Sequence, residues 1–157
     1  MIIIAALTKN HVLGSKGKML WDIPEEKKLF QSFVKGKTLI MGRKTFESAE
    51  RHDTSKKNYI VISRSMKPQP GIDVVRSPQE ALEKAQKYGT EIFCLGGGEI
   101  YKQMLPFSDA LYLSWIKKEY DGDAYFPKFD MAEWKVTQSK DCDEFTFRIY
   151  KRKAAST

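Results

Sequence analysis

The sequence predicts a single α/β domain spanning residues 1–157. We expect a mostly parallel, twisted central sheet of about eight strands, with an antiparallel C-terminal strand and flanking helices. Three observations lead to this class. Short apolar runs rich in Ile and Val alternate with amphipathic stretches. The 157 residues are 41% hydrophobic, enough for a core and a ligand cleft, and no linker, repeat or low-complexity tract divides them. Near the C-terminus the pattern changes to strands joined by a turn.

Apolar runs define the predicted strands. Five of them are too short for a helix and are unbroken rather than alternating, which is typical of strands covered on both faces. They are residues 1–7, 37–42, 58–63, 72–76 and 91–96. Three later runs, 110–116, 133–140 and 145–152, predict strands that close the sheet in antiparallel fashion, the last two flanking the turn-prone DCDE.

The stretches between these runs predict helices at 24–36, 43–50, 77–89 and 98–108. Proline suits the first helical position, which Pro24 and Pro78 would occupy, and Ser77 is suited to cap the third helix. Alternation of strands and helices in this order is typical of βαβ units, and it favours parallel pairing in the first part of the sheet.

The first predicted helix carries an acid of special interest. Side chains three, four and seven places apart share a helix face, so Glu26 lies on the apolar stripe of Leu29, Phe30 and Phe33, while Glu25 points elsewhere. Burial of a carboxylate is costly and raises its pKa unless other groups satisfy it. Glu26 is therefore either a functional acid or a plain partner of the helix dipole, and this stretch alone leaves both open.

Composition limits the class of partner. A net charge of +7 and a pI near 9.3 fit a polyanion or a small anionic ligand such as a nucleotide phosphate. The charge is spread along the chain, so we expect no nucleic-acid partner. The run 1–7 lacks a basic lead and is too short for a signal or a membrane span. Cys94, Cys142, His11 and His52 lack metal-site spacing, which favours a reduced cytoplasmic protein without a structural metal.

Three strand ends carry residues suited to phosphate. Ligands of open α/β sheets bind outside the carboxyl ends of the strands. The residues at these ends are Arg43, Lys44 and Thr45 after the second strand, Ser63 and Arg64 after the third, and Gly96, Gly97 and Gly98 after the fifth. Each group alone could be structural, as a tight turn or a surface base. No P-loop and no early G-x-G-x-x-G is present. The cations together favour a dinucleotide with an extra phosphate.

With these residues in view, the chain resembles the dihydrofolate reductases over nearly its whole length. The resemblance is carried, in order, by IAAL and VLG within residues 4–14, then LWDIPEE, IMGRKTFES, NYIVISR, LGGGEIY, LYLSWI and GDAYFP. It implies a cytoplasmic, monomeric oxidoreductase of one-carbon metabolism, of a kind that antifolates target, which uses NADPH to reduce 7,8-dihydrofolate to 5,6,7,8-tetrahydrofolate. It also implies an adenosine-binding subdomain at about 37–90, a substrate and loop subdomain in the remainder, and a flexible end at 153–157.

The resemblance also implies roles for individual residues. Glu26 would bind the pterin and support protonation at N5, Ser114 would hydrogen-bond its carboxylate, and Trp21 would hold a water near the ring. The implied substrate contacts are Ile4, Ala5, Lys27, Phe30, Ala49, Lys56 and Leu95. The implied cofactor contacts are Ala6, Leu13, Gly14, Met19, Gly42, Arg43, Lys44, Thr45, Ser63, Arg64, Gly96, Gly97, Gly98, Glu99, Ile100 and Tyr101. Asp123 would help to hold the mobile loop that contains Met19, and no metal is implied.

Four departures from the family pattern lie in the half of the pocket that binds the p-aminobenzoyl-glutamate tail. Lys27 stands where a hydrophobic residue is usual, Lys56 where an arginine clamps the tail carboxylate, Asp53 where an apolar contact is expected, and Ala49 where a larger aliphatic is common. Two enzyme readings follow: a dihydrofolate reductase whose Lys27 and Lys56 together neutralise the tail, or a same-fold NADPH-dependent reductase of a tail-less dihydropterin or a ribosylaminopyrimidine. A non-catalytic module that binds NADPH or nucleic acid is the third reading.

Overall fold

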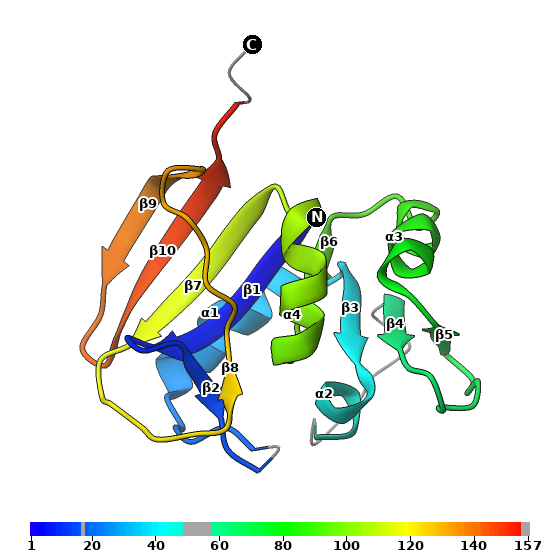
Figure 1. The fold of residues 1–157 in the computed structure, drawn as a ribbon, viewed down its shortest axis with the longest axis horizontal. Coiled ribbons are helices and arrows are strands. Elements are labelled where there is room, and N and C mark those ends of the chain that lie inside the picture. The colour runs from blue at the N-terminus through cyan, green and yellow to red at the C-terminus, as the bar shows by residue number, and fades with distance from the viewer. Residues whose placement is uncertain (17, 49–57, 155–157) are drawn as a thin grey trace.

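The computed structural model describes residues 1–16, 18–48 and 58–154, and they fold around one large sheet (Figure 1). Its strands are β1 (Ile2–Thr8), β3 (Thr38–Gly42), β4 (Asn58–Ile62), β5 (Ile72–Val75), β6 (Ile92–Cys94), β7 (Ala110–Ile116), β9 (Trp134–Asp141) and β10 (Phe145–Arg152). They lie in the order β5-β4-β3-β6-β1-β7-β10-β9. The predicted fold class is confirmed.

The helices begin and end where the sequence supplies caps and breakers. They are α1 (Pro24–Val34), α2 (Arg43–Ser48), α3 (Pro78–Gln86), α4 (Gly98–Met104) and the short 3-10 helix η1 (Leu105–Phe107). The Ser77 hydroxyl caps α3 by accepting a hydrogen bond from the Glu80 N–H at 3.2 Å. The α1 helix ends before Gly36, whose φ of 73° lies in the left-handed region that favours glycine.

The direction of β7 differs from the prediction. This strand pairs in parallel with β1, from Ile2 opposite Ala110 to Thr8 opposite Ile116. Among the described strands of the main sheet, only the pairs of β10 with β7 and with β9 are antiparallel. The reason is the connection: α4 carries the chain back along the sheet between β6 and β7, and such a crossover returns the next strand in the same direction.

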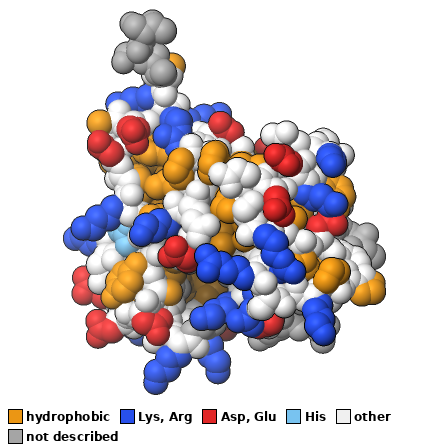
Figure 2. Space-filling model, turned by 45° about the vertical axis from the view of Figure 1, so that its right-hand side comes forward, with side chains coloured by type: hydrophobic (Ala, Val, Ile, Leu, Met, Phe, Trp, Pro, Cys, Tyr) orange, Lys and Arg blue, Asp and Glu red, His pale blue; other side chains and the backbone are white. Residues whose placement is uncertain are grey.

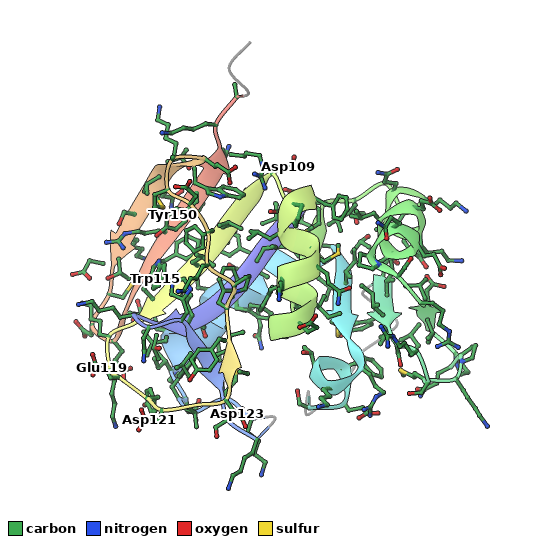
Figure 3. All side chains as sticks on the ribbon, viewed as in Figure 1. Asp109, Trp115, Glu119, Asp121, Asp123 and Tyr150 are labelled. Carbon is green, nitrogen blue, oxygen red and sulfur yellow. The ribbon has the colours of Figure 1, made fainter. Side chains whose placement is uncertain are left out.

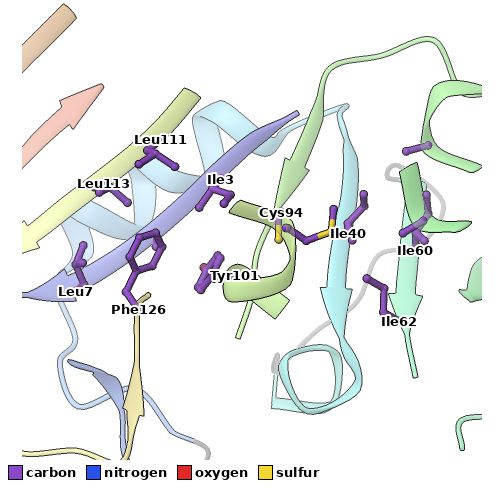
Figure 4. Packing of buried hydrophobic residues seen from close by; sticks show 14 of the residues in the cluster. Ile3, Leu7, Ile40, Ile60, Ile62, Cys94, Tyr101, Leu111, Leu113 and Phe126 are labelled. Carbon is purple, nitrogen blue, oxygen red and sulfur yellow. The ribbon is translucent and has the colours of Figure 1, made fainter. Parts of the chain in front are cut away.

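Successive side chains of each strand enter opposite layers of the core. Ile3, Ile40 and Ile60 belong to one buried cluster, which α3 and α4 cover (Figure 4). Ile4, Leu39 and Val61 belong to a second cluster, which includes Val34 of α1 and Phe46 of α2. The sheet therefore has helices on both faces, as continuous apolar strands require.

A small ribbon was not predicted. Val12–Gly14 (β2) and Ala124–Tyr125 (β8) pair in antiparallel fashion beside the main sheet. Strands of three and two residues are too short to give a periodic pattern, so sequence reasoning passed over them. The ribbon joins two segments more than 100 residues apart and thereby fixes the loop that follows β2.

The surface carries charges of both signs. Figure 2 shows Lys and Arg side chains spread over the visible face, with Asp and Glu among them. This distribution matches the sequence, in which a net charge of +7 is not confined to one stretch. Within the described residues, the helices are all too short or too polar to cross a bilayer.

Candidate active site

The sheet order brings the predicted strand ends to one edge. The strands β4, β3, β6 and β1 are neighbours and run parallel, with Gly42 opposite Ile62 and Ile40 opposite Cys94. Residues that follow these strands therefore meet at the same edge of the sheet. The three groups suited to phosphate lie there beside the end of β1.

Glu26 lies on the buried face of α1, as the helical spacing predicts. Its side chain is 6% exposed, and Ser114 of β7, itself 5% exposed, donates a hydrogen bond to its carboxylate. Desolvation by burial raises the pKa of Glu26, while the Ser114 hydrogen bond and the Lys27 charge oppose that rise without cancelling it. The site thus holds one acid that keeps its proton to a higher pH than an exposed glutamate does.

Trp21 lies directly before α1 and is 7% exposed. Its ring is 5.6 Å from that of Tyr120, centroid to centroid, which fixes one face of the indole. The indole Nε1 is buried, and none of the described residues accepts its hydrogen bond. A buried donor of this kind is normally satisfied by water or a ligand, which fits the predicted role of holding a water beside a bound ring.

A side chain of α4 holds the backbone of β1. The Tyr101 hydroxyl donates a hydrogen bond to the carbonyl of Ile4 at 2.7 Å, and the Tyr101 ring is buried. Ala5 is buried in the core cluster that contains Tyr101, and the half-buried Ala6 packs against the cluster that contains Trp21. This arrangement holds the β1 backbone in one position, where it can present polar groups to a flat ring.

Phe30 and Leu95, two predicted substrate contacts, pack on the side of the sheet that carries α1. Both are half-buried and pack against the core cluster of α1 and β3. Phe30 lies one helical turn beyond Glu26 on the same face of α1, as the sequence predicts. A planar ligand bound by the acid would therefore meet an aromatic side chain.

The glycine turn after β6 is closely packed on one side and open on the other. Gly96 has a φ of 88°, and its carbonyl accepts a hydrogen bond from the Gly42 N–H at 2.8 Å. A methyl group on Gly98 would lie 2.7 Å from the Tyr125 carbonyl oxygen, so no side chain fits there. At Gly97 the nearest atom to such a methyl would be Thr45 Oγ1, at 3.6 Å. The glycine turn after β6 and the first helical turn of α2 are therefore neighbours.

This pair of turns fits a pyrophosphate. The first N–H groups of α2 and α4 have no partner within their own helices, and both helices begin at the ligand-binding edge. Lys44 is exposed at the start of α2, and Thr45 supplies a hydroxyl. Ile100 and Glu99 follow in α4: a methyl on Gly42 would lie 3.0 Å from Ile100 Cγ1, whereas the Glu99 carboxylate accepts a 3.4 Å hydrogen bond from Gln103.

The cations next to this turn are held in different ways. Arg43 pairs with Glu47 at 2.8 Å along α2, and both side chains are substantially exposed. The buried Ser63 Oγ accepts hydrogen bonds from the N–H groups of Ser65 and Met66, at 3.2 and 2.9 Å. Its own O–H proton has no acceptor among the described residues. Arg64 is exposed in the same turn. Arg43 and Arg64 supply two guanidinium groups, and Ser63 supplies one O–H donor. These donors are suited to a phosphate monoester.

Sequence reasoning missed Arg76. This residue directly follows β5, and its Nη1 donates hydrogen bonds to the carbonyls of Ser63 at 2.5 Å and Met66 at 3.3 Å. Arg76 thus holds the turn that presents Ser63 and Arg64. The rule applied to the other strands, that a cation after a parallel strand faces the ligand edge, would have found it.

The loop between β2 and α1 is tied to the segment before β8. The Lys16 N–H donates to both oxygens of Asp123, at 3.2 and 3.1 Å, and the Asp123 N–H donates to the carbonyl of Gly14 at 3.1 Å. Leu13 is half-buried, while Met19, further along the loop, is 56% exposed. The predicted contact of Asp123 with this loop is present.

The predicted tail half of the site is only partly described. The Lys27 Nζ forms an ion pair with Asp22 Oδ1 at 2.7 Å, and both side chains are exposed. Ala49, Asp53 and Lys56 lie outside the described residues. Within the described ranges, no group of three His, Cys, Asp or Glu side chains could hold a metal ion.

The sequence model of the family described as "Dihydrofolate reductase" matches residues 1–152. The chain is similar to the dihydrofolate reductase of Haemophilus influenzae, with 40% identity over 134 residues, covering 85% of this chain and 82% of the relative. It is also similar to the Bacillus subtilis dihydrofolate reductase, with 32% identity over 160 aligned positions, covering 98% of this chain and 95% of the relative.

A solved structure is similar over the same length. It is the dihydrofolate reductase of Enterococcus faecalis complexed with NADP(H) and RAB-propyl. The TM-score is 0.87 at 28% sequence identity, with 98% of this chain and 96% of that chain covered. The eight-stranded sheet and its helices are therefore those of that relative.

Proposed function

The chain belongs to the dihydrofolate reductase family, and on that premise we infer that it reduces 7,8-dihydrofolate to 5,6,7,8-tetrahydrofolate with NADPH. The observation that carries this function is the buried Glu26–Ser114 pair, together with three groups suited to phosphate at the carboxyl ends of strands of the same sheet. An acid with a raised pKa and a phosphate site along one sheet are what reduction of an imine by a phosphorylated dinucleotide requires. The Enterococcus faecalis relative, complexed with NADP(H), supports the cofactor.

Glu26 binds the pterin and supports proton delivery in this proposal. Its carboxylate hydrogen-bonds the amino group and ring nitrogen of the substrate, and its raised pKa keeps a proton available for N5. Ser114 fixes the orientation of the carboxylate. Trp21 holds a water through its buried Nε1, and Phe30 packs on the ring. Ile4, Ala5 and Leu95 are the remaining contacts with the pterin in this proposal, and Lys27, Ala49 and Lys56 are the residues assigned to the tail.

The cofactor side follows from the three strand ends. When bound, NADPH supplies a hydride from its nicotinamide to pterin C6. Arg43, Ser63 and Arg64 bind the 2′-phosphate, and Arg76 holds the turn that carries two of them. Lys44, Thr45, Gly97 and Gly98 bind the pyrophosphate. The remaining contacts with the cofactor are Ala6, Leu13, Gly14, Met19, Gly42, Gly96, Glu99, Ile100 and Tyr101, of which Ala6 and Tyr101 flank the nicotinamide.

The loop that contains Met19 closes the site in this proposal. Asp123 holds the loop through the Lys16 N–H. Closure excludes bulk water from the reacting atoms, which limits side reactions during the transfer of the hydride and the proton.

The subdomain division, the oligomeric state and the cellular compartment complete the proposal. Residues 37–90 form the adenosine-binding part, because the corners at Arg43 and Ser63 both lie within them. The enzyme is a monomer, since the edge strand β9 exposes polar and charged side chains such as Lys135 and Lys140, which disfavour pairing with another chain. It works in the cytoplasm, where Cys94 and Cys142, both free, stay reduced.

The experiment that tests the function is NADPH oxidation by the purified chain. We expect kcat/KM for dihydrofolate to exceed that for a tail-less dihydropterin, and NADPH to be preferred over NADH. Equal kcat/KM for the two substrates would mean that the tail is not recognised. No turnover with either substrate would contradict the proposed function altogether. Among the described residues and the comparisons, nothing favours the ribosylaminopyrimidine or the non-catalytic reading.

A further inference from the structure

A pocket lies away from the proposed active site. Its volume is about 380 Å³, near the lower end of the range that accommodates small-molecule ligands. The lining residues are His11, Trp115, Phe129, Met131, Arg148 and Tyr150, with Val136 at the edge. We call it the distal pocket. Aromatic and apolar side chains with a few polar groups are the usual composition of a ligand site.

The distal pocket is on the opposite face of the sheet from Glu26. Ser114, which hydrogen-bonds Glu26, and Trp115 are consecutive in β7, so their side chains point to opposite faces. Figure 3 places Trp115 and Tyr150 on β7 and β10, in the part of the sheet that α4 leaves uncovered. A ligand here would not overlap the substrate.

The walls are rings held in fixed positions. His11 lies edge-to-face on Trp115 with centroids 5.5 Å apart, and Phe129 does the same on Tyr150 at 5.7 Å. The Trp115 Nε1 donates a hydrogen bond to the Tyr150 hydroxyl at 2.9 Å. At the mouth, Met131 is 47% exposed and Val136 is 41% exposed. The pocket is therefore open to solvent and preformed, which lowers the entropic cost of binding.

Two hydrogen-bond donors of the distal pocket remain available. Arg148 is half-buried, and although its charge acts on Asp141, no described residue forms an ion pair or a hydrogen bond with its guanidinium. The Tyr150 hydroxyl accepts from Trp115, and its own proton has no acceptor among the described residues. A guanidinium and an O–H at an aromatic pocket are both donors, so they favour an acceptor-only, negatively charged group.

We propose that the distal pocket binds a small aromatic carboxylate of one or two rings. The carboxylate accepts hydrogen bonds from Arg148 and Tyr150, and the ring packs against the aromatic wall that Trp115 and Phe129 form with His11. Aromatic side chains can also enclose a quaternary ammonium ion, but the charge of Arg148 opposes a cation. An uncharged ring would gain the apolar contacts and leave the guanidinium unused.

Binding of three probes of similar shape to the unmodified chain tests the proposal. The probes are 2-naphthoate, 2-naphthamide and (2-naphthyl)trimethylammonium. The chain has three tryptophans, and each gives one indole N–H signal in a ¹H–¹⁵N NMR spectrum. With NADPH present, 2-naphthoate is expected to shift the Trp115 signal saturably and leave that of Trp21 unchanged. The neutral amide should bind about tenfold more weakly. Equal or tighter binding of either other probe, a shift confined to Trp21, or no saturable shift overturns the proposal.

A pair of variants tests whether Arg148 is the positive charge that binds the carboxylate. Arg148→Gln should weaken 2-naphthoate binding about tenfold and leave 2-naphthamide binding unchanged. Lys151→Gln is the matched control: it removes one positive charge from the same strand, but Lys151 is exposed and points to the other face of β10. An equal loss in both variants would mean that only the overall charge matters, and it would overturn the proposal. Unchanged dihydrofolate turnover confirms that each variant is folded.

Discussion

The Ser114 hydroxyl of β7 donates a hydrogen bond to the Glu26 carboxylate of α1, which joins the sheet to the helix at the centre of the site. The hydrogen bond lowers the pKa of Glu26, and burial raises it by more. Since the hydrogen bond also fixes the orientation of the carboxylate, Ser114 positions the acid while burial sets its proton affinity. Position and proton affinity can therefore be tested separately.

The buried acid should lower the stability of the fold at neutral pH. Its pKa in the folded chain is raised above the ordinary glutamate value of 4.5, so folding favours the protonated form. The stability that this group contributes is fully present below pH 4.5 and is lost as the pH rises through the folded pKa. Glu26→Gln never ionises, so it should be more stable than the parent at pH 7, by about 0.5–2 kcal/mol. Denaturant unfolding at several pH values measures the difference.

The same series contains its own control. Glu25→Gln alters an exposed acid in the same turn of α1, and it should give a small difference in unfolding free energy that does not follow this pH dependence. The gain in Glu26→Gln should shrink as the pH approaches 4.5. A gain that is constant from pH 4.5 to pH 7 would show that ionisation of Glu26 is not its cause.

The cofactor preference should depend on Arg43 and Arg64. If both guanidinium groups bind the 2′-phosphate, replacing both with alanine removes charge-assisted hydrogen bonds that NADH does not make. The ratio of kcat/KM for NADPH to that for NADH should fall roughly tenfold or more. Lys87→Ala, at the exposed end of α3, should leave the ratio unchanged. If the double variant keeps the parent ratio, the phosphate binds elsewhere.

Loop closure should depend on Asp123. Its carboxylate accepts the Lys16 N–H, and Figure 3 places it with Asp121 on the segment between β7 and β8. Asp123→Ala should lower kcat between a few-fold and about tenfold, because the pair is exposed and screened. Asp121→Ala removes an equal charge from the same segment, and Asp121 forms no hydrogen bond or ion pair with the described residues of the loop, so this variant should retain the parent kcat. Similar losses in the two variants would indicate a general charge effect rather than loop closure.

Recognition of the tail should involve Lys27. Its Nζ contacts Asp22 at 2.7 Å and is exposed, so it can turn toward a bound carboxylate. Lys27→Gln should raise the KM for dihydrofolate a few-fold without changing the KM for a tail-less dihydropterin. Lys28→Gln, its exposed neighbour, is the control. A parallel rise for both substrates would place Lys27 at the pterin ring instead.

Much of this site could be predicted because local sequence patterns and the general geometry of parallel sheets determine it. The position of Glu26 follows from helical periodicity, the Ser77 cap from side-chain chemistry, and the meeting of Arg43, Ser63 and Gly97 from the geometry of parallel strands. The roles of these residues came from the family resemblance rather than from spacing. Ala49 and Lys56 lie outside the described residues, so their predicted contacts stay predictions.

What sequence reasoning missed depends on long-range pairing. The β2–β8 ribbon brings Gly14 and Asp123 together across more than 100 residues, and neither strand is long enough to be recognised. The parallel direction of β7 depends on the crossover through α4, not on the residues of β7. The contact of Arg76 with the Ser63 carbonyl arises only when β5 pairs with β4.

The most direct test of the central claim is NADPH oxidation with dihydrofolate at pH 7, comparing the parent with Glu26→Gln and Glu25→Gln. We expect kcat to fall at least about a hundredfold in Glu26→Gln, with NADPH affinity nearly unchanged, because Glu26 supports protonation at N5 and does not contact the cofactor in this proposal. Glu25→Gln should keep the parent rate. Parent-like turnover in Glu26→Gln would contradict the assignment of the acid, and with it the proposed mechanism.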